Sequence, residues 1–167
     1  MISHGVVTEQ QVFEDWRSYD GRPATSPIRT DIIHARFPRD AEWHDAEIEA
    51  LDVPKMFLIS VGDFAPFSRN TWSLEVTAEN YAAGFHDSDH SIRFEKLVKR
   101  HSPFNTRLVL VTDTLDGPYT IIDGNHRAVL LLVDNRLIGT KVHLGVHPKI
   151  RQFDHAGMAY RNWPQQG

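Results

Sequence analysis

The spacing of apolar residues predicts one helix near the start of the chain. Thr8-Glu9-Gln10-Gln11 has the sequence of a capping box, in which side chains satisfy the first backbone N–H groups of a helix. Apolar residues then recur at helical spacing: Val12, Phe13, Trp16 and Tyr19. Asp20-Gly21-Arg22-Pro23 is expected to end this helix, because glycine and proline favour a turn.

The next thirty or so residues carry a weaker pattern. Residues 24–39, with three prolines within or beside them, are predicted to be a connecting arm with room for one short strand. Asp40 is expected to cap a second helix that runs through Leu51. In this interpretation residues 1–55 form a helical N-terminal extension.

Short elements are predicted in the middle of the chain. Residues 56–61 are an apolar run with the length of a buried strand, and residues 62–67 then turn the chain. Thr77 is expected to cap a short helix that ends near Gly84, and Asp89 to cap another. Four residues share one face of that last helix: Phe94, Leu97, Val98 and His101.

The clearest pattern lies in the second half of the chain. It predicts strands at 107–112, 119–122 and 141–146, and a buried helix at 126–133. Asp123-Gly124-Asn125 separates the second strand from the helix. This order indicates an α/β (α+β) fold with a mixed sheet and flanking helices, and it places a sharp turn at one edge of the sheet.

Composition changes this picture little. The chain has 167 residues, of which 41% are apolar and 24% charged, so one globular domain with a hydrophobic core is expected. No apolar run approaches the roughly 20 residues of a membrane-spanning helix, so no membrane partner is expected. Because there is no signal-peptide pattern and no cysteine, the cytoplasm is the simplest location.

The charge balance argues against DNA as a partner. The formal net charge is −4 with histidines taken as neutral, whereas non-specific DNA binding depends on clustered lysine and arginine. The strongest basic group lies on one predicted helix and consists of Lys96, Lys99 and Arg100. A solvated helix face explains that group at least as well as a nucleic-acid surface does.

Asp123-Gly124-Asn125-His126-Arg127 combines residue types that bind anions. Glycine permits a tight turn, and a helix that starts directly after it presents free N–H groups and the positive end of its dipole. Arg127 would add a planar set of donors that fits two phosphate oxygens. Asp123 is expected to hold Mg²⁺ or to orient His126, and His126 to act as an acid–base group or to stabilise a phosphoryl group.

A purely structural interpretation of the same residues also fits. Asp123 or Asn125 would then cap the helix, Arg127 would pair with Asp123, and His126 would be a satisfied buried polar group. Taken singly, each residue favours that interpretation. Together, at a strand-to-helix turn, they favour an anion or nucleotide site.

The segment Tyr119-Thr120-Ile121-Ile122-Asp123-Gly124-Asn125-His126-Arg127-Ala128 resembles the signature of the ParB/sulfiredoxin superfamily. Members show an apolar strand followed by Asp-Gly-x-His-Arg or Gly-x-x-Arg at the start of a helix. The resemblance covers residues 56–147, with residues 1–55 as an extension and residues 148–167 as a C-terminal tail of the same domain.

The resemblance implies that the turn binds Mg²⁺ with ATP, ADP or CTP. Superfamily members include CTP-hydrolysing partition proteins, ATP-dependent sulfinic-acid reductases and ATP- or ADP-dependent kinases of free serine, and some have been described as nucleases. By this resemblance, Gly124, Asn125, His126 and Arg127 would hold phosphate. Asp123 and His126 would also match residues that support phosphoryl transfer in the free-serine kinases.

Two departures from the superfamily narrow this implication. A sulfiredoxin needs a cysteine in the turn, and the chain has none. The free-serine kinases carry a catalytic glutamate after the first strand in a Pro-x-Glu setting, whereas the best match here is Pro66-Phe67-Ser68. Ser68, Asp63 or Glu75 would have to replace that glutamate.

Other candidate residues lie outside the turn. His86-Asp87-Ser88-Asp89-His90 places two histidines four residues apart, a spacing that lets His86 and His90 bind a metal ion on a helix. Arg69 follows the first predicted strand of the resembling region and is a candidate second phosphate ligand. His143 and His147 lie on the polar side of the last strand and are expected to face the turn or water.

Three functional hypotheses follow from the sequence. The first is a nucleotide-binding enzyme that uses Mg²⁺ to transfer a phosphoryl group to a small hydroxylated metabolite or to hydrolyse the nucleotide. The second is a non-catalytic, nucleotide-responsive module that contacts a protein partner through its N-terminal extension. The third is a metal-dependent enzyme of another kind, such as a nuclease.

Overall fold

The structure, a computed structural model, describes residues 1–19, 39–60, 64–85, 88–99 and 107–163. Several sequence-based predictions fall outside these residues: the short strand within 24–39, the turn at Asp20 to Pro23, Asp63, His86 and His101. Within the described residues, no helix combines the length and the apolar character that crossing a bilayer requires.

Six strands form one mixed sheet, which confirms the predicted fold class. The strands are β1 (Ile2–Val7), β2 (Glu42–Glu47), β3 (Met56–Leu58), β4 (Leu108–Thr112), β5 (Tyr119–Asp123) and β6 (Lys141–Val146). Their order across the sheet is β1-β2-β6-β4-β5-β3. Two pairs, β4 with β6 and β3 with β5, are parallel, and the other neighbours are antiparallel.

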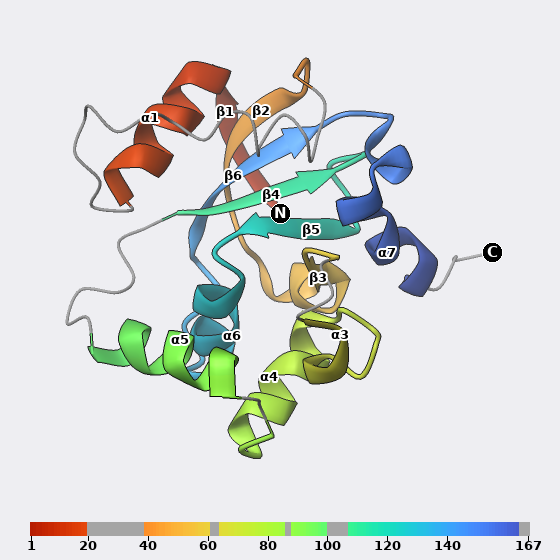
Figure 1. Cartoon of the computed structure of the whole chain (residues 1–167). Helices are drawn as coiled ribbons and strands as arrows, with labels where there is room; N and C mark the ends of the chain where they lie inside the picture. Colours follow the sequence, from red (N-terminus) through yellow and green to blue (C-terminus); the bar gives the residue numbers. More distant parts are fainter. Residues whose placement is uncertain (20–38, 61–63, 86–87, 100–106, 164–167) are drawn as a thin grey trace.

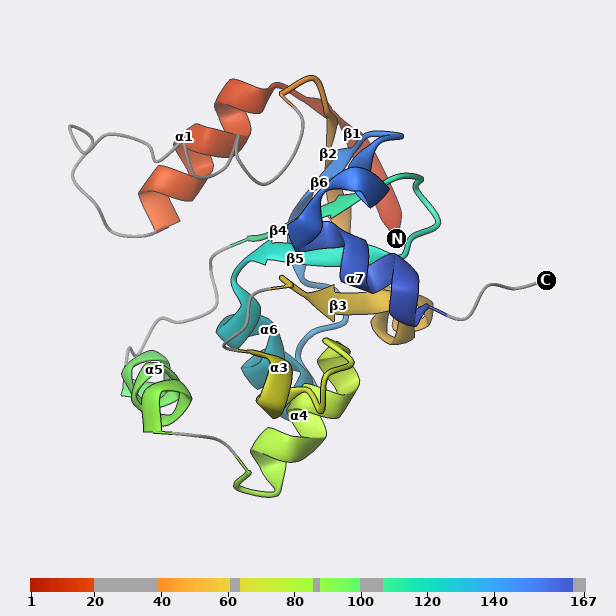
Figure 2. The ribbon, with the colours of Figure 1, turned by 45° about the vertical axis from the view of Figure 1, so that its right-hand side comes forward.

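Helices cover both faces of the sheet (Figures 1 and 2). They are α1 (Glu9–Tyr19), α3 (Phe64–Phe67), α4 (Leu74–Ala82), α5 (Ser88–Lys99), α6 (Asn125–Val133) and α7 (Asp154–Asn162), with 3-10 turns η1 (Ala50–Lys55) and η2 (Ile150–Gln152). Helices α1 and α7 lie on one face, and α3 to α6 gather on the other.

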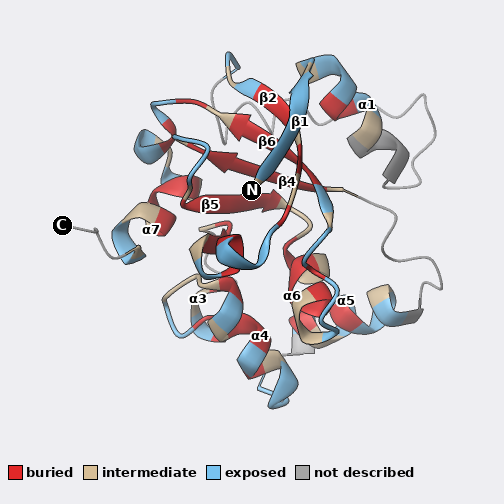
Figure 3. Ribbon diagram, turned by 180° about the vertical axis from the view of Figure 1, so that it is seen from behind, coloured by how far each residue is buried: buried red, intermediate tan, exposed pale blue. Residues whose placement is uncertain are grey.

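The central strand β4 divides the core into two clusters. Leu108 and Leu110 pack with α3, α4, α5 and α6, whereas Val109 and Val111 pack with α1 and α7. Both faces of β4 are therefore buried, which explains why its sequence is continuously apolar rather than alternating. Figure 3 shows the buried middle of the sheet and the exposed strand β1 at its edge.

The predicted first helix is confirmed together with its capping box. The Thr8 backbone N–H donates to Oε1 of Gln11 at 3.1 Å, and the Gln11 N–H donates to Oγ1 of Thr8 at 3.2 Å. These two bonds satisfy groups that the start of α1 leaves without helical partners. Val12 and Phe13 are then buried against the sheet.

The predicted helix from Asp40 to Leu51 is wrong, because strand β2 occupies its centre. Its six residues pair with β6 on one side, and β1 pairs with it on the other. Backbone pairing on both sides outweighs the local pattern. Strand β1, which sequence analysis missed, is almost entirely exposed and so carries no buried apolar residue to reveal it.

Three smaller predictions also need correction. Helix α4 is capped by Ser73, whose Oγ accepts from the Val76 N–H at 3.4 Å, whereas Thr77 is buried inside the helix. The expected turn at 62–67 ends in the single helical turn α3. Val98 is 61% exposed, so it does not share the buried face of Phe94 on α5.

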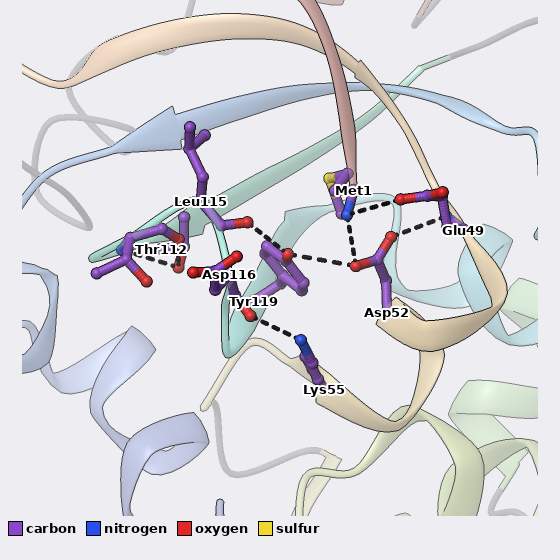
Figure 4. A network of polar contacts seen from close by, with 9 residues as sticks. Met1, Glu49, Asp52, Lys55, Thr112, Leu115, Asp116 and Tyr119 are labelled. Atoms are coloured by element: carbon purple, nitrogen blue, oxygen red, sulfur yellow. Dashed lines mark hydrogen bonds and ion pairs between the residues drawn. The ribbon is translucent and has the colours of Figure 1, made fainter.

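A polar network joins the amino end of the chain to η1 and to the start of β5 (Figure 4). The Met1 amino group lies 2.8 Å from Oδ1 of Asp52 and 3.3 Å from Oε2 of Glu49. The Tyr119 hydroxyl lies 2.7 Å from the Leu115 carbonyl oxygen and 3.3 Å from Asp52. Burial and the nearby Asp52 carboxylate raise the pKa of Tyr119, so its hydroxyl stays protonated and donates.

We expect glycine-to-alanine substitutions at two positions to change stability in opposite directions. A Cβ at Gly145 would lie 3.0–3.2 Å from the buried ring of Trp43 on β2, so Gly145→Ala should lower the free energy of unfolding by about 1 kcal/mol. At Gly157 in α7 a Cβ would meet ordinary contacts of 3.4 Å or more, so Gly157→Ala should raise it by roughly 0.5 kcal/mol. Urea unfolding measures both, and a Gly145→Ala variant as stable as the wild type or more stable would contradict the close packing of Gly145 against Trp43.

Candidate functional site

The β5–α6 turn strongly favours glycine at position 124. Strand β5 ends at Asp123, Gly124 has a φ of 88°, and α6 begins at Asn125. A Cβ at this position would lie 2.5 Å from Cδ2 of Leu108 and 2.9 Å from Nη2 of Arg127. The left-handed backbone and the close approach of Leu108 and Arg127 therefore both favour glycine.

Arg127 folds back over this glycine toward the end of β5. Its Nη2 donates to Oδ2 of Asp123 at 2.6 Å, and the two side chains are 14% and 28% exposed. The pairing considered in the structural interpretation is therefore present. Because a cation near a helix N-terminus is opposed by the helix dipole, the Asp123 carboxylate offsets the cost of placing Arg127 there.

Asn125 connects the turn to the neighbouring parallel strand. Its side-chain Oδ1 accepts a 3.0 Å hydrogen bond from the Ile59 N–H, just beyond β3, and the residue is 8% exposed. This bond holds the carboxyl ends of β3 and β5 together. The N-cap residue of α6 is Gly124, which has no side chain to cap the helix, and the Asn125 side chain is directed to Ile59 rather than to the first turn.

His126 is paired with a second histidine that comes from another helix. Its Nε2 lies 2.9 Å from Nδ1 of His90 on α5, and His90 is 2% exposed. Aromatic rings enclose the pair, with centroid distances of 4.9 Å from Phe64 to His90 and 5.0 Å from Phe94 to His126. The pair lies in an apolar pocket of side chains, although His126 itself remains partly exposed.

The geometry of this pair limits its protonation. One nitrogen must donate and the other accept, so the contact is compatible with no added proton or with one. A second added proton would place two donors against each other and break the hydrogen bond.

The structure describes only one of the two residues of the predicted metal site at His86 and His90. His90 faces His126, and His86 lies outside the described residues. Within the described ranges no three histidine, aspartate or glutamate side chains stand close enough together to hold a metal ion. The buried face of α5 directs His90 toward α6, and a metal site at His86 and His90 stays a prediction.

The candidates for the missing glutamate fall in three different settings. Ser68 is fully buried, and its Oγ accepts from the Trp72 N–H at 3.0 Å and lies 3.3 Å from the Ala65 carbonyl oxygen, so it supports the loop after α3. Glu75 is exposed in the first turn of α4. Asp63 lies outside the described residues.

Arg69 is exposed in the turn after α3, where its φ is 52°. Its side chain makes no hydrogen bond or ion pair with the described residues of the β5–α6 turn. The structure therefore does not bring Arg69 into contact with Arg127, and its role as a second phosphate ligand remains a prediction.

His143 and His147 do not face water as expected. His143, on β6, is 1% exposed under α1, with Nε2 3.0 Å from Oδ2 of Asp15 and with its buried Nδ1 lacking a hydrogen bond. His147 is 8% exposed and lies 3.2 Å from Asp40. The alternating pattern predicted a polar face open to water for His143 and His147. This was wrong because β6 lies inside the sheet and is covered on both faces.

Sequence reasoning missed two polar residues beside the turn. Ser60 directly follows Ile59, and its N–H donates to the His155 carbonyl at 3.0 Å, which brings the start of α7 to the carboxyl end of β3. Ser60 could have been noticed, because it is the one polar residue within the apolar run 56–61. Nothing in the sequence around His155 indicates its contact with Ser60, because the two residues are almost a hundred positions apart in the chain.

Comparison of the chain with models of protein families, with curated proteins and with solved structures finds no match. The resemblance to the ParB/sulfiredoxin superfamily therefore rests on the residues of the turn and on their order in the chain.

We expect Asn125 to stabilise the fold through its bond to Ile59. Asn125→Leu removes the acceptor and leaves a buried N–H without a partner, so the free energy of unfolding should fall by about 1–3 kcal/mol. Asn125→Asp keeps an acceptor oxygen and adds negative charge near the start of α6, so it should cost much less. Chemical denaturation of the two variants measures the difference, and equal losses would mean that the hydrogen bond contributes little.

Stability should fall in acid because of His143. Burial, and secondarily the nearby Arg107, lower the pKa of His143 below its ordinary 6.5, against the opposing effect of Asp15. As the pH falls through about 6.5, the unfolded chain takes up a proton that the folded chain does not yet bind. The folded state therefore loses stability between that pH and the lower pKa of the folded protein.

His143→Gln should remove this part of the pH dependence. We expect the slope of unfolding free energy against pH between 5 and 7 to fall by up to about 1.4 kcal/mol per pH unit, the limit for one proton. His4→Gln is the matched control, because the His4 side chain is 45% exposed. An unchanged slope in His143→Gln would show that His143 binds its proton equally in both states.

Proposed function

We propose that this protein is a cytoplasmic enzyme that binds ATP, ADP or CTP with Mg²⁺ at the β5–α6 turn. It transfers the terminal phosphoryl group to a small hydroxylated metabolite or hydrolyses the nucleotide. One observation carries the proposal: the Arg127 guanidinium is held over Gly124, at the start of a helix whose N-cap residue has no side chain. The turn thus places a fixed cation beside backbone N–H groups, which is an arrangement suited to phosphate.

Asp123 has two roles in this proposal. It orients Arg127 through the 2.6 Å ion pair. It also supplies one carboxylate to Mg²⁺, which proteins commonly hold with one or two carboxylates while phosphate oxygens and water complete the shell. Such an ion would neutralise charge on the transferring phosphate.

His126 serves as the proton acceptor in the proposed reaction. Its contact with His90 through Nε2 fixes the imidazole ring at the start of α6, where it would accept a proton from the attacking hydroxyl or water. The aromatic rings around the pair exclude water from its buried side. His90 can relay the proton, because the pair holds one proton without losing its hydrogen bond.

A second candidate is a nucleotide-responsive module without catalytic activity. It is favoured by Ser68, which stands where the resembling kinases carry glutamate but whose Oγ already hydrogen-bonds the loop backbone. The exposed edge strand β1 also suits a protein partner, since an edge strand leaves backbone groups available for pairing. This candidate predicts nucleotide binding without turnover.

Calorimetric titration with ATP, ADP and CTP, each with and without Mg²⁺, tests the proposed site. We expect one of these nucleotides to bind the wild type, and Arg127→Ala to weaken its binding about tenfold to a hundredfold through loss of a charged hydrogen-bond donor. Arg136→Ala, an exposed arginine just beyond the other end of α6, is the matched control and should bind normally. If no nucleotide binds, or if both variants bind like the wild type, the turn is not a nucleotide site.

Turnover separates the two candidates. Asp123→Asn should abolish Mg²⁺-dependent release of phosphate or diphosphate, yet keep or strengthen binding without Mg²⁺, because it removes a negative charge beside Arg127. His126→Ala should abolish turnover while binding persists. If the wild type binds a nucleotide but does not turn it over, the non-catalytic module is supported instead.

A further inference from the structure

The two edges of the sheet differ in how the rest of the chain covers them. At one edge, β3 has only three residues, and its outer side meets the segment before α4. There Phe57 forms a bridge with Ser73, and the Leu58 N–H donates to the Trp72 carbonyl oxygen at 2.7 Å. At the other edge, β1 has six residues and, among the described strands, pairs only with β2. The β1 edge is therefore the one that a further strand can extend.

Strand β1 lacks the residues that usually protect an exposed edge. Natural edge strands often carry lysine, other charges or proline, which oppose pairing with a second chain. Residues 2–7 contain no lysine, arginine, aspartate, glutamate or proline. Two apolar side chains are accessible instead, since Ile2 is 47% and Val6 is 69% exposed, and Figure 3 shows the strand at the surface. A strand of this composition is suited to pairing with another strand.

A bulge in β1 indicates which strand matches its full length. The register against β2 passes from Ser3 to Gly5 and leaves His4 without an opposite residue. A regular strand on the outer side would likewise leave one residue of β1 unmatched. A second copy of β1 carries the same extra residue, so two antiparallel copies match residue for residue when their bulges lie opposite each other.

The faces of the side chains agree with that arrangement. The positions of their partners on β2 show that Ile2 and Val7 lie on one face of the sheet, and Ser3 and Val6 on the other. If Ile2 lies opposite Val7 of an antiparallel copy, Ser3 lies opposite Val6, and His4 lies opposite Gly5. Each opposing pair outside the bulge then shares one face, as cross-strand pairs must.

The charges near β1 permit two copies to approach. Pairing identical strands is unfavourable when like charges lie opposite each other, but His4 is the one titratable side chain in residues 2–7, and it would lie opposite a glycine. The nearest carboxylates of β2 already have partners in their own copy. Asp45 pairs with Arg107, and Glu47 lies 3.6 Å from Nε2 of His4.

We propose that this protein forms a symmetric dimer through antiparallel pairing of two β1 strands, with the two-fold axis between His4 and Gly5. Each Ile2 then packs beside Val7 of the second copy, and the two six-stranded sheets become one continuous sheet. The proposal identifies the protein that covers the β1 edge as a second copy of this chain. It does not depend on nucleotide binding at the β5–α6 turn.

Analytical ultracentrifugation of the nucleotide-free protein gives the first test. We expect a monomer–dimer equilibrium with a dissociation constant of roughly 1–100 μM, because two short strands bury less than the ~1,600 Å² of a standard stable interface. Val6→Lys places two lysines at the paired edges and should raise the dissociation constant at least about tenfold. Val98→Lys is the matched control, because Val98 is a 61% exposed valine on α5, and it should dimerise like the wild type.

Disulfide formation between single-cysteine variants tests the register. The chain has no cysteine, so an introduced pair gives an unambiguous result. Opposite residues of antiparallel strands lie within the Cα separation that a disulfide spans. Under mild oxidation, a mixture of Ser3→Cys and Val6→Cys should give a covalent dimer on a non-reducing gel, whereas neither variant alone should. A mixture of Ser3→Cys and Val7→Cys is the control and should stay uncoupled, because these residues lie on opposite faces.

Three results would overturn the inference. A wild type that stays monomeric up to about 500 μM would leave the β1 edge open to another kind of strand or to none. A dimer that Val6→Lys does not weaken would use a different surface. Coupling of Ser3→Cys with Val7→Cys but not with Val6→Cys would exclude the proposed axis. Because every measurement uses the nucleotide-free protein, failure of the proposed nucleotide site would not change any of these results.

Discussion

The absence of space for a side chain at position 124 determines how the sheet meets the candidate site. The backbone of the turn rests directly on Leu108, the first residue of β4, and its left-handed conformation carries the chain from β5 straight into α6. Arg127 then folds over the same glycine to reach Asp123. Core packing and the placement of the guanidinium therefore depend on one close approach of backbone and side chain.

Elements with a strong local pattern could be predicted from the sequence, whereas elements formed by distant pairing could not. Strands β4 and β5 and helix α6 carry long apolar runs because the core covers them. In β2 the buried residues Trp43 and Ala46 are three apart, as on a helix, and only pairing with β1 and β6 makes the segment a strand. Strand β1 is exposed, so no hydrophobic pattern could reveal it.

The candidate site likewise contains residues that the sequence could reveal and residues that it could not. Its first part is contiguous in sequence, from Asp123 to Arg127, and residue chemistry alone was enough to single it out. Its partners come from elsewhere: His90 from α5, Ser60 from the end of β3 and His155 from α7. A polar residue shows its chemistry in the sequence but not its partner, since the tertiary fold decides which side chains meet.

The position of the site in the sheet also implies a gradient in local dynamics. Strand β4 is buried along its whole length between β5 and β6, so its amide protons should exchange with solvent only when the domain unfolds globally. Strand β3 has three residues and lies at the sheet edge, where brief local openings are sufficient for exchange. Asp123 thus ends a strand that pairs directly with β4, whereas Ser60 belongs to a segment that opens more often. A molecule that contacts both would slow exchange in β3 far more than in β4, and part of its binding free energy would hold that edge closed.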